Sequence, residues 1–202
     1  MHISDGVLSG GVCLVSAAAA VALASFSLKK TSTSDVPRVA VMTAAFFVAS
    51  LIHVKIGPAS SHLVLNGLLG AVLGIAAFPA ILTALIFQAI MFQHGGITTL
   101  GVNALIMGVP ALISGFIFRY RGSSGIYMRG VRAFISGFTA VMISAAGVAL
   151  YLLTAGEEFL STAKVVVYMN IPVAVIEGAA TLIIVSFLMK VKPEILNNKP
   201  GN

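Results

Sequence analysis

The stretch GVRAFISGFTAVMISAAGVALYLL, residues 130–153, decides the class of fold. Its one charged side chain, Arg132, lies near its start, and the 21 residues after it are almost all apolar or small. About 20 such residues in a helix are enough to cross the hydrocarbon core of a bilayer. The stretch therefore predicts a transmembrane helix.

The rest of the chain has the same character. Of its 202 residues, 58% are hydrophobic and only 9% are charged, and the mean hydropathy is +1.05. Soluble domains are roughly 45–50% apolar and roughly 25% charged, so this composition excludes a soluble enzyme, a nucleic-acid-binding protein and a disordered chain. We expect a multi-pass protein of the cell inner (plasma) membrane, with the lipid bilayer as its surroundings.

Breaks at charges, Pro and Gly divide the chain into seven candidate spans. They are residues 8–28, 37–55, 60–77, 79–93, 97–118, 130–153 and 164–189, with a weak boundary at Phe78-Pro79. Seven spans of about 20 residues leave only short loops. The sequence thus predicts an all-α, polytopic membrane protein whose residues 1–202 form a single transmembrane domain. Met1 to Leu8 lack the basic residues of a signal peptide, so we expect this segment to be retained.

The positions of Lys and Arg predict the orientation in the membrane. With the N-terminus outside and the C-terminus inside, ten basic residues fall on the inner side and only Lys55 and Lys164 fall outside. The inner ten are Lys29, Lys30, Arg38, Arg119, Arg121, Arg129, Arg132, Lys190, Lys192 and Lys199.

On this topology the four histidines, His2, His53, His62 and His94, gather at or near the outer face. Polar groups are costly in a bilayer, so such clustering indicates a metal site, with hydrogen-bonded core histidines as the alternative. Met1-His2 sharpens this hypothesis. A free α-amine, the next amide nitrogen and the His2 imidazole can close fused chelate rings, and a fourth imidazole would complete a square of nitrogens, which favours Ni(II) or Cu(II). An exposed second residue with no ligand role is the other interpretation of His2.

The opening residues MHISDGVLS, 1–9, resemble the signature of the nickel/cobalt substrate-binding (S) components of energy-coupling factor transporters. The similarity continues in SSHL at 60–63 with Asn66-Gly67 and Gly70, and in FQHGGITTLGVN at 92–103. It extends through Ile171-Pro172, Ile176-Glu177-Gly178 and VKPEIL at 191–196. These blocks cover nearly the whole chain.

The resemblance implies a seven-helix fold with the N-terminal loop tucked into the helix bundle. It implies that Met1, His2 and His62 hold the metal, reached from outside. The partners it implies are a membrane scaffold (T) subunit, ATPase (A) subunits and an additional small membrane subunit. Many relatives have histidine where this chain has Asn170, which leaves any direct role for that position in doubt.

Further candidates each have a structural alternative. His94 and Asn103 flank Gly95-Gly96 and are candidates to hydrogen-bond the metal histidines, or simply to pack at helix ends. Glu177 is the only carboxylate inside a predicted span and is a functional candidate on that ground, or a structural hydrogen-bond acceptor for a loop. We expect Asp5 to cap the first helix, and His53 with Lys55 to form an interfacial pair.

A partner surface is indicated by Ala40, Ala44, Ala45 and Ala49, whose spacing lets another helix approach closely. In related S components such a stripe meets the T subunit, and internal packing is the alternative. The chain has no phosphate-binding Gly-x-x-x-x-Gly-Lys motif, so ATP hydrolysis would occur in separate subunits.

The sequence therefore predicts the specificity subunit of an ATP-driven importer, itself not an enzyme, that transports Ni(II) as its substrate and uses no organic cofactor. Co(II) uptake by the same kind of subunit is the nearest alternative. A self-sufficient divalent-cation channel or secondary transporter would predict several intramembrane carboxylates or an inverted repeat. An intramembrane metallohydrolase would predict His-Glu-x-x-His.

Overall fold

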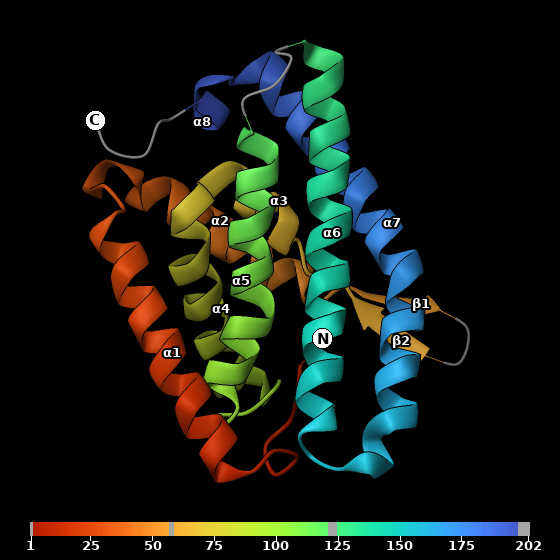
Figure 1. The fold of residues 1–202 in the computed structure, drawn as a ribbon. Coiled ribbons are helices and arrows are strands. Elements are labelled where there is room, and N and C mark those ends of the chain that lie inside the picture. The colour runs from red at the N-terminus through yellow and green to blue at the C-terminus, as the bar shows by residue number, and fades with distance from the viewer. Residues whose placement is uncertain (1, 57–58, 121–124, 198–202) are drawn as a thin grey trace.

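The computed structural model describes residues 2–56, 59–120 and 125–197, and describes only the backbone of 53–56, 59–62 and 197. It is a bundle of helices with one small hairpin at its side (Figure 1). The helices are α1 (Gly10–Lys29), α2 (Val36–Ala49), α3 (Asn66–Leu73), α4 (Ala77–Phe92), α5 (Leu100–Arg119), α6 (Ile126–Leu153), α7 (Leu160–Val191) and α8 (Glu194–Asn197). The short 3-10 turns η1 (Thr33–Asp35), η2 (Gly74–Ala76) and η3 (Glu157–Phe159) join some of them.

Seven helices precede the short α8 in the described part of the chain, as predicted, but they are not seven full spans. Five stretches are long and apolar enough to cross a membrane: α1, residues 66–92, α5, α6 and the stretch that contains α7. Helix α2 has 14 residues and α3 has 8. At 1.5 Å per residue neither reaches across a hydrocarbon core of about 30 Å.

The break between the third and fourth predicted spans falls at Gly74 rather than at Phe78-Pro79. Gly74 has φ +59°, a backbone conformation that glycine adopts without steric cost. Pro79 instead lies in the first turn of α4, where a missing amide hydrogen breaks no helical bond. The Arg119 guanidinium donates to the carbonyls of Ala71 and Val72, which satisfies the open end of α3.

The fold is almost entirely helical, in agreement with the all-α prediction, with one local exception in the described part of the chain. Residues predicted to end the second span and to begin the third form an antiparallel hairpin, β1 (His53–Ile56) and β2 (Ala59–His62). Its register sets His53 opposite His62. The β-branched Val54 and Ile56 favour a strand, and Gly57-Pro58 cannot continue a helix.

All eight residues of α3 are buried, because glycines bring this helix close to its neighbours. A Cβ on Gly67 would lie 2.6 Å from the Cα of Gly137 on α6, and one on Gly70 would clash with the Ala111 carbonyl of α5. Gly137 in turn allows α7 to approach, since a Cβ there would lie 2.6 Å from the Glu177 carbonyl oxygen. Small residues thus bring α7 beside the start of α3.

The connections divide between the two ends of the bundle. The start of α1, the α4–α5 loop and the α6–α7 loop lie at one end. The α1–α2 connection, the end of α5 and the start of α6 lie with α8 at the other (Figure 1). Basic residues in the last turns of α1, α5 and α7 belong to the second end. This arrangement agrees with the predicted separation of charge, while the orientation in the membrane stays a prediction.

Candidate metal centre

The N-terminal segment, residues 2–9, packs against the start of α5, with Ile3 and Leu8 buried and residues 4–6 exposed. Ile3 is only 3% exposed. Its amide donates to Asn103 Oδ1 at 2.9 Å, and its carbonyl accepts from Asn103 Nδ2 at 3.0 Å and from Thr99 Oγ1 at 2.9 Å. A buried amide side chain that pairs both polar groups of one residue fixes the position of that residue. The segment is therefore tucked into the bundle, as the resemblance implied.

Asp5 anchors the same segment at the N-terminus of α5, and not at α1 as expected. Its carboxylate accepts from the amides of Ile97, Thr98 and Thr99, each at 3.1 Å, and from the Thr98 hydroxyl at 2.5 Å. The Thr98 hydroxyl bond, with the amide bonds, lowers the pKa of Asp5, although burial acts in the opposite direction. Helix α1 is capped by Ser9, whose side chain accepts from the Val12 amide.

These contacts carry His2 to Gln88, which lies near the C-terminal end of α4. Its Nε2 lies 3.0 Å from Oε1 of Gln88, a side chain with no exposed surface. Gln88 Nε2 donates to Ser50 Oγ at 2.8 Å, and the Ser50 hydroxyl donates to the Phe47 carbonyl at 2.6 Å. Sequence reasoning missed Gln88 and Ser50, although an amide within an apolar helix is itself a signal because its burial is costly.

His94 and Asn103, predicted to support the metal histidines, both lie close to His2. The rings of His94 and His2 have their centroids 6.2 Å apart. Gly95 makes this packing possible: it has φ +82°, and a Cβ on it would lie 2.7 Å from Asn103 Nδ2 and 3.4 Å from His2 Cδ2. The glycine between the two candidates therefore permits the close packing of His2 and Asn103.

Glu177, the third supporting candidate, holds a different segment. It is fully buried on α7, and its carboxylate accepts from the amides of Val64 and Leu65, the latter at 2.9 and 3.0 Å. Leu65 has φ +52°, an uncommon conformation for a branched residue. Glu177 thus fixes the backbone two residues after His62. This contact is the structural role, a hydrogen-bond acceptor for a loop, that the sequence offered as the alternative to a functional one.

The two other predicted ligands, Met1 and the His62 side chain, lie outside the described residues. The side chains of His53 and Lys55, the predicted interfacial pair, lie outside them as well. Among the residues that are described, no three His, Cys, Asp or Glu side chains converge as a metal site would require. Asn170, the departure from many relatives, is buried on α7 and donates from Nδ2 to the Val166 carbonyl of its own helix at 2.7 Å.

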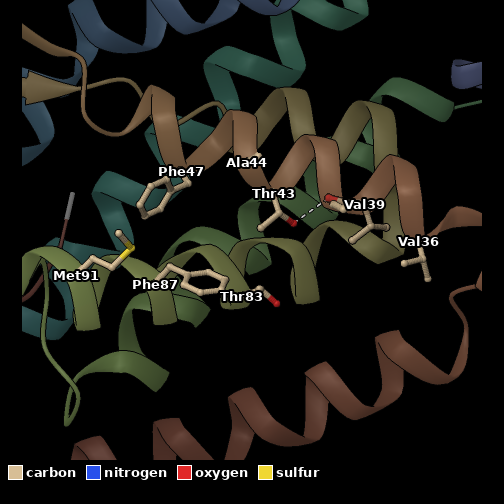
Figure 2. Close-up of a pocket in the computed structure, with 9 residues that line it drawn as sticks. Val36, Val39, Thr43, Ala44, Phe47, Thr83, Phe87 and Met91 are labelled. Carbon is tan, nitrogen blue, oxygen red and sulfur yellow. Dashed lines mark hydrogen bonds between the residues drawn. The ribbon is translucent and has the colours of Figure 1, made fainter.

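An apolar groove lies between α2 and α4. It has a volume of about 500 Å³, and Figure 2 shows its lining. The lining residues are Val36, Val39, Ala40, Thr43, Ala44 and Phe47 of α2 with Thr83, Phe87 and Met91 of α4. Ala40 and Ala44 of the predicted alanine stripe therefore face this groove, whereas Ala49 is buried in the bundle.

Comparison with known proteins agrees with this architecture. A family model described as "Cobalt uptake substrate-specific transmembrane region" matches residues 2–195. A putative metal transport protein of Haemophilus influenzae is 35% identical over 98% of this chain and 97% of its own length. The cobalt transport protein CbiM of Kyrpidia tusciae is 33% identical over 98% of this chain and 86% of its own.

Two more distant relatives are fusions, and one solved structure shares the fold. A putative fused nickel transport protein NikMN of Archaeoglobus fulgidus and a putative fused cobalt transport protein CbiMQ of Methanocorpusculum labreanum are each 28% identical. They match 100% and 96% of this chain, which covers 70% and 36% of their lengths. The crystal structure of a truncated transition metal transporter superposes with a TM-score of 0.77 at 27% identity, over 94% of this chain and 99% of that one.

The matched relatives are transport proteins rather than enzymes, and the family match runs through the N-terminal segment, both sides of the hairpin and the last long helix. The protein is thus a multi-pass membrane protein. It belongs to the CbiM family of cobalt- and nickel-uptake S components of transition-metal transporters.

Proposed function

We propose that this chain is the substrate-binding subunit of an ATP-driven importer that captures Ni(II) from outside the cell. The observation that carries the proposal is the docking of residues 2–5, in which the bundle binds backbone groups of the N-terminal segment and leads His2 inward. A docked segment is what a chelate formed by the chain terminus needs, because its donors must be held in one place.

The donors proposed for the ion are the Met1 α-amine, the His2 amide nitrogen and imidazole, and the His62 imidazole. The amine and the amide nitrogen close a five-membered ring with the metal, and the amide nitrogen and His2 Nδ1 close a six-membered one. Four nitrogens in a plane suit Ni(II). Glu177 supports the fourth donor, since it fixes the backbone just after His62.

Nickel is proposed as the main substrate, and cobalt is the alternative. The proposed ligands are the same for both ions, so the preference of the site for Ni(II) or Co(II) depends on the coordination chemistry of the ion itself. The Irving–Williams order places Ni(II) above Co(II), and a planar set of nitrogens favours Ni(II) further. Relatives carry both descriptions, nickel transport in one fusion and cobalt transport in others.

For delivery of the ion we propose an N-out, C-in orientation and partners that supply the energy. The relative in which a CbiM-type segment is fused to a further transport segment supports a membrane partner. The T subunit is proposed to meet the apolar groove between α2 and α4, which Ala40 and Ala44 help to line. Separate A subunits are proposed to hydrolyse ATP. Rotation of this chain against the T subunit would then open the site inward. A self-sufficient channel is less well supported, because Glu177 is engaged by backbone amides.

The test compares metal content after purification with an unmodified N-terminus. We expect stoichiometric nickel in the wild type and a steep loss in His62→Ala. His53→Ala is the matched control, since it changes the residue opposite His62 in the same hairpin. Stoichiometric nickel in His62→Ala would refute the assignment of that ligand.

Uptake assays test the subunit role. Cells that express this chain alone should accumulate no nickel above background, and co-expression of the T and A subunits should restore uptake. Uptake by the chain alone at the full rate would favour the channel. Orientation is tested in a Cys13→Ala background, where a cysteine at Glu157 should react with an impermeant reagent outside intact cells and one at Tyr127 should not.

A further inference from the structure

A directional chain of hydrogen bonds leads from α2 through α4 to His2. The Phe47 backbone carbonyl can only accept, so the Ser50 hydroxyl, 2.6 Å away, donates its one hydrogen there. Ser50 Oγ must then accept from Gln88, which places the Gln88 amide nitrogen toward Ser50 at 2.8 Å. The amide oxygen consequently faces His2 Nε2 at 3.0 Å. Because that oxygen only accepts, Nε2 carries the hydrogen.

The direction of this chain selects one tautomer of His2. In a neutral imidazole with hydrogen on Nε2, the lone pair is on Nδ1. Nδ1 is also the ring nitrogen near enough to the backbone to close a six-membered chelate ring with the His2 amide. The hydrogen-bond chain and the chelate therefore require the same tautomer, although they involve opposite sides of the ring.

We propose that Gln88, held by Ser50, is a positioning residue that presets His2 Nδ1 as the metal donor by binding the hydrogen on Nε2. The proposal rests on the proposed metal-binding function and deepens it. It explains why an amide with no exposed surface lies within an apolar helix: both of its polar ends have partners, so its burial carries no unpaired group. The Gln88 carbonyl, by accepting a hydrogen bond from Nε2, also makes Nδ1 more basic and so a stronger metal ligand.

The test uses three variants of the full chain with its native N-terminus. Gln88→Leu keeps the volume and removes the acceptor. Gln88→Glu keeps an oxygen acceptor toward Nε2 and serves as the conservative rescue. Ser144→Ala is the matched control, because it removes another buried bond between an amide and a hydroxyl, that of Asn66 Nδ2 to Ser144 Oγ at 2.9 Å.

Two measurements are made on each variant. The first is the ¹⁵N shift of the His2 ring nitrogens in metal-free protein, assigned with His2→Ala, which reports the tautomer without any metal. The second is Ni²⁺ titration followed by calorimetry and by the absorption band of planar Ni(II). We expect the wild type and Ser144→Ala to have hydrogen on Nε2 and to bind alike. Gln88→Leu should show mixed tautomers and about 10- to 100-fold weaker binding, the usual loss for such supporting residues, and Gln88→Glu should recover most of the affinity.

The outcomes separate this proposal from the proposed function. If the wild type binds no nickel, the proposed function fails and the role of Gln88 fails with it. If the wild type binds nickel and Gln88→Leu keeps the same affinity, tautomer and absorption band, the role of Gln88 is refuted while the function stands. Should Gln88→Leu fail to fold, Ser50→Ala decides: it frees the amide of Gln88 to turn, so unchanged binding and an unchanged tautomer would overturn the proposal.

Discussion

Replacing Asn103 with Leu should release the N-terminal segment and weaken nickel binding, because Asn103 pairs both backbone groups of Ile3. Leu has the same branching and the same number of side-chain heavy atoms as Asn and suits a helix, so α5 should persist. The change removes the bond from the Ile3 amide at 2.9 Å and the bond to its carbonyl at 3.0 Å. The carbonyl still accepts from Thr99 Oγ1 at 2.9 Å. The Ile3 amide, in a residue 3% exposed, loses the partner that holds it.

The loss of stability can be worked out because Asn103→Leu leaves the Ile3 amide without its partner, whereas the Ile3 carbonyl keeps its bond from Thr99 Oγ1. A buried donor left without a partner costs about 1–3 kcal/mol, and the loss of a bond whose acceptor keeps another partner costs about 0.5–1.5 kcal/mol. The docked segment should therefore become less stable by about 2–4 kcal/mol. Since about 1.4 kcal/mol corresponds to a tenfold change in affinity, nickel binding should weaken on the order of 30- to 1000-fold.

The assay is Ni²⁺ titration by calorimetry, together with amide hydrogen exchange of residues 2–9 in metal-free protein. The matched control is Ser114→Ala on the same helix, which removes a buried bond to the Gly67 carbonyl at 2.8 Å, remote from the segment. We expect faster exchange and weaker binding in Asn103→Leu only. If exchange accelerates but affinity stays equal to that of the control, docking of the segment does not limit binding, and the reasoning is refuted.

Three further predictions concern the same segment. One residue inserted between Met1 and His2 should abolish high-affinity nickel binding, because the amine can no longer close its chelate ring, whereas a tag after Asn202 should have no effect; equal calorimetric affinities would exclude the amine as a ligand. Gly95→Ala should weaken binding, since a Cβ there strains the backbone by about 1–2 kcal/mol and meets Asn103, while Gly10→Ala, with no atom nearby, should leave the titration unchanged. The interactions that lower the pKa of Asp5 stabilise docking at any pH above the ordinary aspartate pKa of about 3.9. This stabilisation is lost as the pH falls through the lower pKa of Asp5 in the folded protein. Hydrogen exchange of the Ile97–Thr99 amides in metal-free protein should show this loss of protection at low pH, and the Asp5→Asn variant should not.

Much of the helical architecture could be predicted because it depends on local composition. The long apolar runs became α1, α5, α6 and α7 close to their predicted limits. The errors in the predicted helix limits arose where one local sequence feature is compatible with two backbone structures. Pro79 was taken as a break, but proline is tolerated in the first turn of a helix, and the left-handed conformation of Gly74 ends α3 instead. The apolar residues around the hairpin resemble a span in composition although their backbone pairs as strands.

Part of the candidate site could likewise be predicted from the sequence, and part could not. The resemblance of the first nine residues pointed to His2, and the docking of the N-terminal segment that it implied is seen at Ile3. His94 and Asn103 lie near His2, while their support of the metal histidines stays a prediction. The ligand roles of Met1, His2 and His62 stay predictions. Asp5 was assigned to the wrong helix, because its partners Thr98 and Thr99 lie more than 90 residues away and no local pattern marks them.

By itself, the sequence determined that this protein spans a membrane, that its spans are helices and where the longest of them run. The physical reason is that transfer of a segment into lipid depends on the segment's own side chains, and that its backbone groups must then be satisfied within it. Only the tertiary structure decided that Gln88 faces His2, that Asn103 pairs Ile3 and that Glu177 holds the chain after His62. Each of these bonds joins residues 86 to 112 positions apart, so it exists only because glycine-mediated helix packing brings those positions within hydrogen-bonding distance.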